Sequence, residues 1–133
     1  QITAMQTTYG FTTPEKTTSG LVFQKTLENP TGAAILTGQL VKVNYTGRLG
    51  YGYIQTDATN KVVYDSKFGS GTLTFTAGAG QLIAGFEEAA LKLKVGEKGK
   101  AILPYTIAYG ASGNSTIPGY SPLYFEIEVV SAQ

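Results

Sequence analysis

Residues 78 to 104 contain the one amphipathic helix that the sequence clearly predicts. Its apolar residues recur at spacings of three and four, which places on one stripe Leu82, Phe86, Ala89, Ala90 and Leu93. Glu88 and Lys92 are spaced to pair across one turn, and Gly96 is suited to close the helix. One short helix cannot bury its stripe alone, so the rest of the chain must supply an apolar surface.

The remaining apolar segments predict that this surface is a β-sheet. Strand-like composition or alternation is found over residues 21–26, 40–45, 62–65, 73–76, 98–103 and 123–130. Thr46-Gly47 is expected to end the second of these strands, residues 68–71 (FGSG) are expected to turn, and residues 105–119 are expected to form a long loop. The sequence therefore predicts an α+β domain in which an antiparallel sheet wraps the helix stripe.

Composition excludes several classes of chemistry. The chain has 133 residues, enough for one domain, and its net charge of +1 gives no indication of nucleic-acid binding. It contains no Cys and no His, so disulfides, cysteine nucleophiles, histidine-assisted triads and most zinc sites are excluded. No apolar run is long enough to span a bilayer, and no signal peptide is visible, although one could have been removed before residue 1.

The N-terminal residues 1–18 are polar, rich in Thr and aperiodic. This pattern is typical of a tether or poorly ordered leader, and the alternative is an additional edge strand around residues 9–13. Low charge and many Thr, Tyr, Gly and Asn residues suggest an extracytoplasmic location, with a cytoplasmic one left open.

Six motifs in order resemble the FKBP-type peptidyl-prolyl cis-trans isomerases, from Ser19 to the end of the chain. They are SGLVF (19–23), VKVNYTGRL (41–49), VYDS (63–66), LIAGFEEAALKLKVGEK (82–98), AYGASG (108–113) and IPGYSPLYFEIEVV (117–130). The resemblance implies an isomerase domain over residues 19–133, with a curled antiparallel sheet wrapped around one short α-helix. Relative to the family, residues 50–62 look like an insertion where a short turn is usual.

The resemblance also implies an apolar pocket between the sheet and the helix. It implies catalytic roles for Tyr45, Tyr64, Asp65, Phe86 and Tyr109, with substrate-binding roles for Leu73, Phe75, Leu82, Ile83, Ile117 and Phe125. Phe86 would form the floor, while the Ile83 amide and the Tyr109 hydroxyl would hold substrate carbonyls. The family more often has Trp at the position of Phe86 and an aromatic residue at that of Leu73, which puts tight macrolide binding in doubt.

Each of these residues also has a simpler interpretation. Phe86 and Phe125 are suited to an ordinary core, Tyr45 and Tyr109 to strand or loop positions, and Asp65 to a turn. The resemblance implies a monomeric isomerase that assists protein folding, binds proline-containing peptides, unfolded proteins and possible macrolide inhibitors, and needs no metal or other cofactor. The alternative function is a similar module that binds proline-containing peptides or acts as a chaperone with little catalysis.

Overall fold

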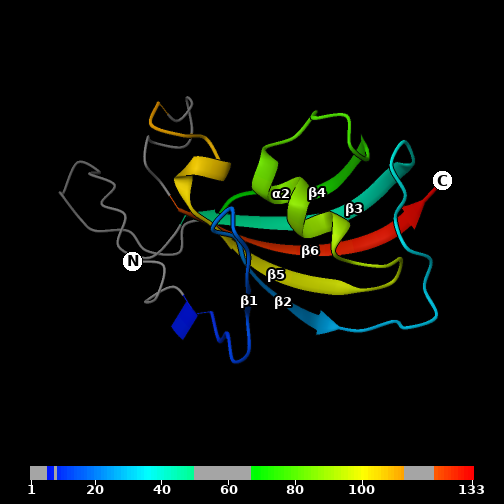
Figure 1. The fold of residues 1–133 in the computed structure, drawn as a ribbon, viewed down its shortest axis with the longest axis horizontal. Coiled ribbons are helices and arrows are strands. Elements are labelled where there is room, and N and C mark those ends of the chain that lie inside the picture. Colours follow the sequence, from blue (N-terminus) through cyan, green and yellow to red (C-terminus); the bar gives the residue numbers. More distant parts are fainter. Residues whose placement is uncertain (1–5, 8, 50–66, 113–121) are drawn as a thin grey trace.

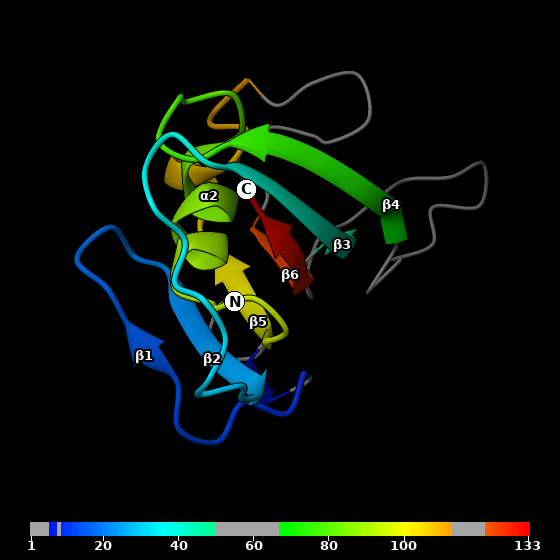
Figure 2. The same ribbon diagram turned by 90° about the vertical axis from the view of Figure 1, so that its right-hand side faces the viewer.

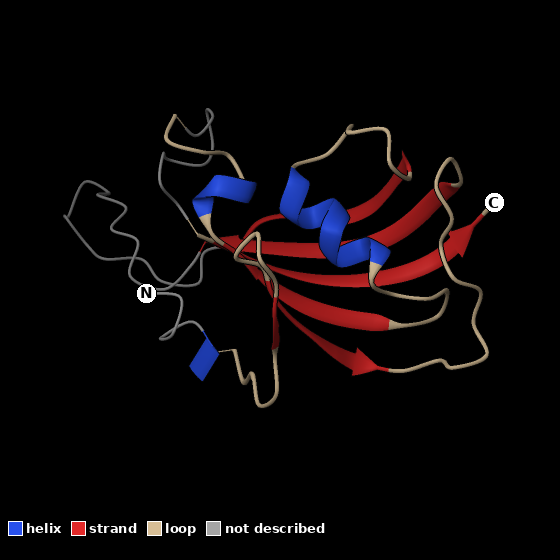
Figure 3. Cartoon of the chain, in the orientation of Figure 1, coloured by secondary structure: helices blue, strands red, loops and turns tan. Residues whose placement is uncertain are grey.

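The computed structural model describes residues 6–7, 9–49, 67–112 and 122–133. In these parts the chain forms one six-stranded antiparallel sheet that curves around a helix (Figure 1). The elements are β1 (Glu15–Lys16), β2 (Val22–Leu27), β3 (Leu40–Leu49), β4 (Lys67–Thr76), α2 (Ala84–Leu91), β5 (Lys98–Leu103), the 3-10 helix η1 (Tyr105–Ile107) and β6 (Leu123–Ala132). The sheet order is β1-β2-β5-β6-β3-β4, so the predicted fold class is confirmed (Figure 3).

Strand β6 follows the predicted alternation: Phe125, Ile127 and Val129 are buried, while Glu126 is exposed. Two predicted breaks in neighbouring strands are wrong. Strand β3 continues past Thr46-Gly47, and residues 68–71 lie within β4 instead of forming a turn. The two glycine-containing segments pair with each other, Gly47 opposite Gly69 and Thr46 opposite Ser70. The pairing between the strands therefore outweighs the low preference of glycine for strand conformation.

Helix α2 lies against one face of the curved sheet (Figure 2). The predicted stripe is buried there at Phe86, Ala89, Ala90 and Leu93. The helix ends earlier than expected, with Lys92 as its C-cap, and Gly96, with a φ of 89°, instead takes the left-handed conformation in the turn that leads into β5.

The expected pair between Glu88 and Lys92 is replaced by contacts with the N-terminal segment. Ser19 Oγ donates to Glu88 Oε1 at 2.6 Å, and Lys92 Nζ lies 3.1 Å from Glu15 Oε2. Both side chains on the exposed side of α2 therefore connect the helix to residues that precede β2.

Residues 9–19, here called the N-terminal strap, pack on the domain, which differs from the loose tether predicted for this part of the chain. The Tyr9 ring stacks on the Tyr124 ring with centroids 3.8 Å apart, and Phe11 meets Tyr124 edge-on at 6.3 Å. They cover a second small apolar cluster, Val22, Ile102 and Tyr124, on the sheet face opposite α2. Polar composition concealed this contact, because only two aromatic side chains of the strap supply it.

A lysine and a short strand hold the strap in place. Lys100 Nζ donates to the carbonyl oxygens of Tyr9 at 2.7 Å and Gly10 at 2.9 Å, and lies 4.8 Å from the centroid of the Phe11 ring. Further along, β1 pairs with β2 through Glu15 opposite Phe23 and Lys16 opposite Val22. The strap thus forms one edge of the sheet and covers part of its outer face.

Replacing both Tyr9 and Phe11 by alanine is expected to lower the free energy of unfolding by about 2–4 kcal/mol, because the variant loses the packing of two partly buried rings against Tyr124. Urea denaturation of the purified variant measures this difference. Thr13→Ala is the matched control, since the strap's contact at Thr13 uses its backbone amide, which donates to Gln24. A double variant as stable as this control would show that the strap contributes nothing to folding.

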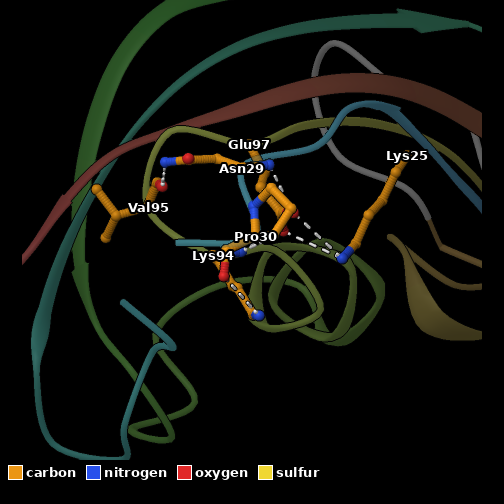
Figure 4. Close-up of polar contacts among 6 residues, drawn as sticks. All are labelled: Lys25, Asn29, Pro30, Lys94, Val95 and Glu97. Atoms are coloured by element: carbon orange, nitrogen blue, oxygen red, sulfur yellow. Dashed lines mark hydrogen bonds and ion pairs between the residues drawn. The ribbon is translucent and has the colours of Figure 1, made fainter. Parts of the chain in front are cut away.

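One buried carboxylate joins the loop after β2 to the turn before β5 (Figure 4). Glu97 is 2% exposed and accepts hydrogen bonds from the backbone amides of Lys94 at 2.7 Å and Asn29 at 3.0 Å, while Lys25 Nζ lies 3.1 Å from Oε1. Asn29 Nδ2 in turn donates to the Val95 carbonyl at 2.8 Å. Burial alone raises the pKa of the Glu97 carboxyl, but the two amides and Lys25 outweigh it and hold the pKa below its ordinary value.

Candidate active site

Three aromatic rings from three elements meet between the helix and the sheet. Tyr45 comes from β3, Phe86 from α2 and Phe125 from β6. The Phe86 and Phe125 rings meet edge-on with centroids 5.0 Å apart, Tyr45 meets Phe86 edge-on at 5.8 Å, and Tyr45 lies 6.4 Å from Phe125. Phe86 and Phe125 are each only 3% exposed, whereas Tyr45 is half-buried. The rings form an aromatic floor with Tyr45 at its accessible side.

Strand and helix periodicity explain why these three rings converge. Tyr45 and Phe125 occupy positions that alternate toward the helix side of their strands, next to the buried residues Val43 and Ile127. Phe86 lies on the apolar stripe of α2 that faces the same side. Edge-to-face contacts between rings at these separations add to the stability gained from burial alone.

Half-buried apolar side chains surround this floor. All of the predicted site residues that lie in the described parts of the chain belong to one core cluster, with Phe75, Phe86 and Phe125 buried and the rest partly buried against them: Tyr45, Leu73, Leu82, Ile83 and Tyr109. The structure therefore brings these eight residues together. The other three predicted site residues, Tyr64, Asp65 and Ile117, lie outside the described residues, as does the predicted insertion at residues 50–62.

The half-buried residues come from strands and from two connections. Leu73 lies opposite Val43 in the pairing of β4 with β3, and Leu82 and Ile83 immediately precede α2. Tyr109 follows η1, where the Gly110 amide donates to the Tyr105 carbonyl at 2.9 Å and closes the turn after Tyr109. The floor is thus bordered by Leu73 on a strand and by Leu82, Ile83 and Tyr109, whose positions depend on loops.

Ile107 and Ala108 also pack, partly buried, against the same cluster and were not predicted as site residues. Ile107 lies close to helix α2, since a Cβ added at Gly85 would lie 2.9 Å from its Cδ1. The available signal was the apolar run Ile107-Ala108-Tyr109, which the loop composition of the surrounding segment concealed.

A hollow of about 280 Å³ lies at the outer face of the sheet, lined mostly by polar and charged residues of β3, β5 and β6, and it meets the cluster only at Tyr45 and Ile127. Its charged and polar lining is largely paired already: Asn44 Nδ2 donates to Glu128 at 3.1 Å, Lys98 lies 3.8 Å from Glu128, and Lys100 binds the strap. We therefore assign the candidate active site to the aromatic floor and its surroundings.

The described site residues can act through apolar surface, tyrosine hydroxyls and backbone amides. Among the described residues no group of His, Cys, Asp or Glu is arranged to hold a metal ion. None of the helices in the described parts is long and apolar enough to cross a membrane. A curved sheet around one helix, with an aromatic floor in which Tyr45 is half-buried, defines a class of small α+β domains with an apolar cluster between helix and sheet.

The comparisons identify the family within this class. The family model for FKBP-type peptidyl-prolyl cis-trans isomerase matches residues 32–130. The chain belongs to the FKBP-type peptidyl-prolyl cis-trans isomerase family, whose members are enzymes.

Individual relatives agree with this result. The chain is 35% identical over 117 residues to the macrophage infectivity potentiator of Trypanosoma cruzi, covering 87% of this chain and 55% of that protein. It is 36% identical over 96 residues to FK506-binding protein 2 of Dictyostelium discoideum, covering 71% of this chain and 65% of that protein. The crystal structure of FkpA from Escherichia coli superposes with a TM-score of 0.77 at 25% identity, covering 98% of this chain and 57% of that one. The chain thus spans between half and two thirds of the length of these proteins.

Proposed function

We propose that this chain is an active isomerase domain that accelerates rotation about Xaa-Pro bonds and assists the folding of other proteins. The observation that carries the proposal is the aromatic floor of Tyr45, Phe86 and Phe125, bordered by side chains that are only half-buried. Because these bordering side chains are only half-buried, part of their apolar surface remains accessible to a bound peptide. Family membership makes proline-containing peptides the substrate class that suits this surface.

The reaction suits an apolar site without a nucleophile. Rotation about a peptide bond crosses a barrier of about 18–20 kcal/mol, because resonance gives the bond partial double-bond character. The twisted transition state has lost that resonance and is less polar than the planar amide, so an apolar floor disfavours the planar state relative to it. Donors such as the Ile83 amide and the Tyr109 hydroxyl would hold the carbonyl groups on either side.

A protease-coupled assay on a short Xaa-Pro peptide tests the proposal, and Tyr109→Phe tests the role of the hydroxyl. Since one net hydrogen bond is worth about 0.5–1.5 kcal/mol, kcat/KM is expected to fall roughly two- to tenfold. Tyr105→Phe is the matched control, because Tyr105 is more exposed and lies outside the site cluster. An active wild type with equal rates in both variants would remove Tyr109 from the mechanism.

The same assay decides between catalysis and simple binding. A wild-type chain that binds a proline-containing peptide in titration calorimetry without accelerating its isomerisation would be a binding module, which is the alternative function. Inhibition by the macrolide FK506 can be measured in parallel, since one relative is named for binding that compound. We expect weaker inhibition than in family members with Trp at the position of Phe86.

We also propose that the domain is monomeric and resides outside the cytoplasm. The location is supported by composition, which is low in charge and rich in Thr, Tyr, Gly and Asn. Size-exclusion chromatography with light scattering tests the first statement, and fractionation of the source cells tests the second.

A further inference from the structure

The start of the loop between β4 and α2 is held by two side chains that accept from its backbone amides. Glu87 Oε1 accepts a hydrogen bond from the Gly78 amide at 2.6 Å, and Gln81 Oε1 accepts one from the Thr76 amide at 2.8 Å. The loop carries two of the half-buried residues that border the aromatic floor, Leu82 and Ile83. Its geometry therefore decides where one side of the site lies.

Glu87 contacts the two ends of this loop at once. Its carboxylate accepts from Gly78 at the start, and its backbone amide makes the ordinary first-turn helical bond to the carbonyl of the N-cap residue Ile83, at the end, at 3.2 Å. An acidic residue in the first turn of a helix commonly acts on the free amides of the helix itself. Here the carboxylate reaches back to the loop, and Ile83, at the N-cap, has no side-chain capping bond.

Glycine is needed at the other end of this contact. Gly78 has a φ of 82°, and a Cβ added there would lie 2.9 Å from Thr37 Cγ2. The backbone can therefore present its amide to Glu87 only in a conformation that other residues rarely adopt. We call the hydrogen bond between the Glu87 carboxylate and the Gly78 amide the Glu87–Gly78 clasp.

We propose that Glu87 is a positioning residue for substrate binding, because the Glu87–Gly78 clasp fixes the loop that carries Leu82 and Ile83. The inference rests on the proposed isomerase function and adds a residue that does not itself touch the substrate. Leu82 and Ile83 are not fully buried, so packing alone holds them less firmly than it holds Phe86. Without the clasp the loop would sample further conformations, and only a fraction of molecules would be competent to bind.

The test compares Glu87→Ala with Glu87→Gln and with Glu88→Ala. Glu88 is the matched control, because it is the adjacent acidic residue of α2 and its carboxylate accepts one hydrogen bond at 2.6 Å, from Ser19. Since a smaller competent fraction raises the apparent dissociation constant in proportion, Glu87→Ala should raise KM for an Xaa-Pro peptide about three- to tenfold with kcat nearly unchanged. Glu87→Gln keeps an acceptor oxygen, so its KM should stay within about twofold of wild type, as should that of Glu88→Ala.

Amide hydrogen exchange supplies a second readout that does not depend on activity. The Gly78 amide should exchange at least about tenfold faster in Glu87→Ala than in wild type, and at the wild-type rate in Glu88→Ala. Equal KM values in Glu87→Ala and Glu88→Ala, no rescue by Glu87→Gln, or unchanged exchange at Gly78 would each overturn the inference. A wild-type chain that does not isomerise the peptide refutes the proposed function instead. The Glu87–Gly78 clasp is then tested only by the rate of hydrogen exchange at the Gly78 amide.

Discussion

Replacing Phe86 by alanine is expected to lower the free energy of unfolding by about 3–5 kcal/mol, the usual cost of removing a buried aromatic ring. The side chain is 3% exposed and meets Phe125 and Tyr45 edge-on, so its loss leaves a cavity beneath the site and removes two ring contacts. Chemical denaturation measures the change in stability. The kcat/KM of the folded fraction should fall as well, because the floor of the site is gone.

Two further substitutions give this experiment its controls. Phe86→Trp should cost about 1–3 kcal/mol, less than the alanine variant, since it keeps an aromatic floor beside the half-buried Tyr45 but is larger than Phe. Leu91→Ala removes a side chain that is 40% exposed on the same helix and should change stability by less than about 1 kcal/mol. If Phe86→Ala were as stable as Leu91→Ala, Phe86 would not be packed under the sheet.

Replacing Glu97 by glutamine is expected to destabilise the domain by about 2–4 kcal/mol near neutral pH. The two carboxylate oxygens accept from the Lys94 and Asn29 amides, so an amide group of the same shape must turn its NH₂ toward one of these donors. It also leaves Lys25 without its anionic partner, a loss moderated because Lys25 is 33% exposed. Glu126→Gln, on the exposed face of β6, is the control and should change stability by less than about 0.5 kcal/mol.

The pH dependence of this difference identifies its cause. The pKa of Glu97 is lower in the folded chain than its ordinary value, so its contribution is fully present above the unfolded pKa and is lost as the pH falls through the folded one. Denaturation curves for wild type and Glu97→Gln between about pH 7 and about pH 3 should therefore converge toward the acid end. A gap that stays constant over this range would show that shape, and not charge, accounts for the destabilisation.

The helix, the fold class and most strands could be predicted because their signals are local. The three- and four-residue spacing around Phe86 and the alternation from Phe125 to Val129 are visible within a dozen residues. The segment at residues 68–71 was predicted wrongly because its strand conformation depends on pairing with β3, about twenty positions earlier in the chain. The strap was predicted as a tether because its contacts with Tyr124 and Lys100 lie far away in sequence.

The candidate site was predictable to the extent that motifs carry it. Family resemblance named the eight described residues that the structure gathers into one cluster. Periodicity alone predicts that Phe86 is buried, but it could not have shown whether Phe86 forms the floor of a site or only part of the core. The polar contacts could not be predicted, since nothing in the sequence pairs Glu97 with Asn29 or Glu87 with Gly78. Their partners are backbone amides, which every residue except proline possesses.

The sheet order has a consequence for anyone who shortens this chain. The region matched by the family model begins at residue 32, but β2 (Val22–Leu27) lies between β1 and β5 in the sheet. A fragment that starts there would turn β5 into a bare edge, with backbone groups opposite Val22 and Phe23 left unpaired beside the apolar residues Ala101, Ile102 and Leu103. Such an edge is a template for pairing with a second molecule, so the shortened chain should self-associate and precipitate where the longer one stays dispersed.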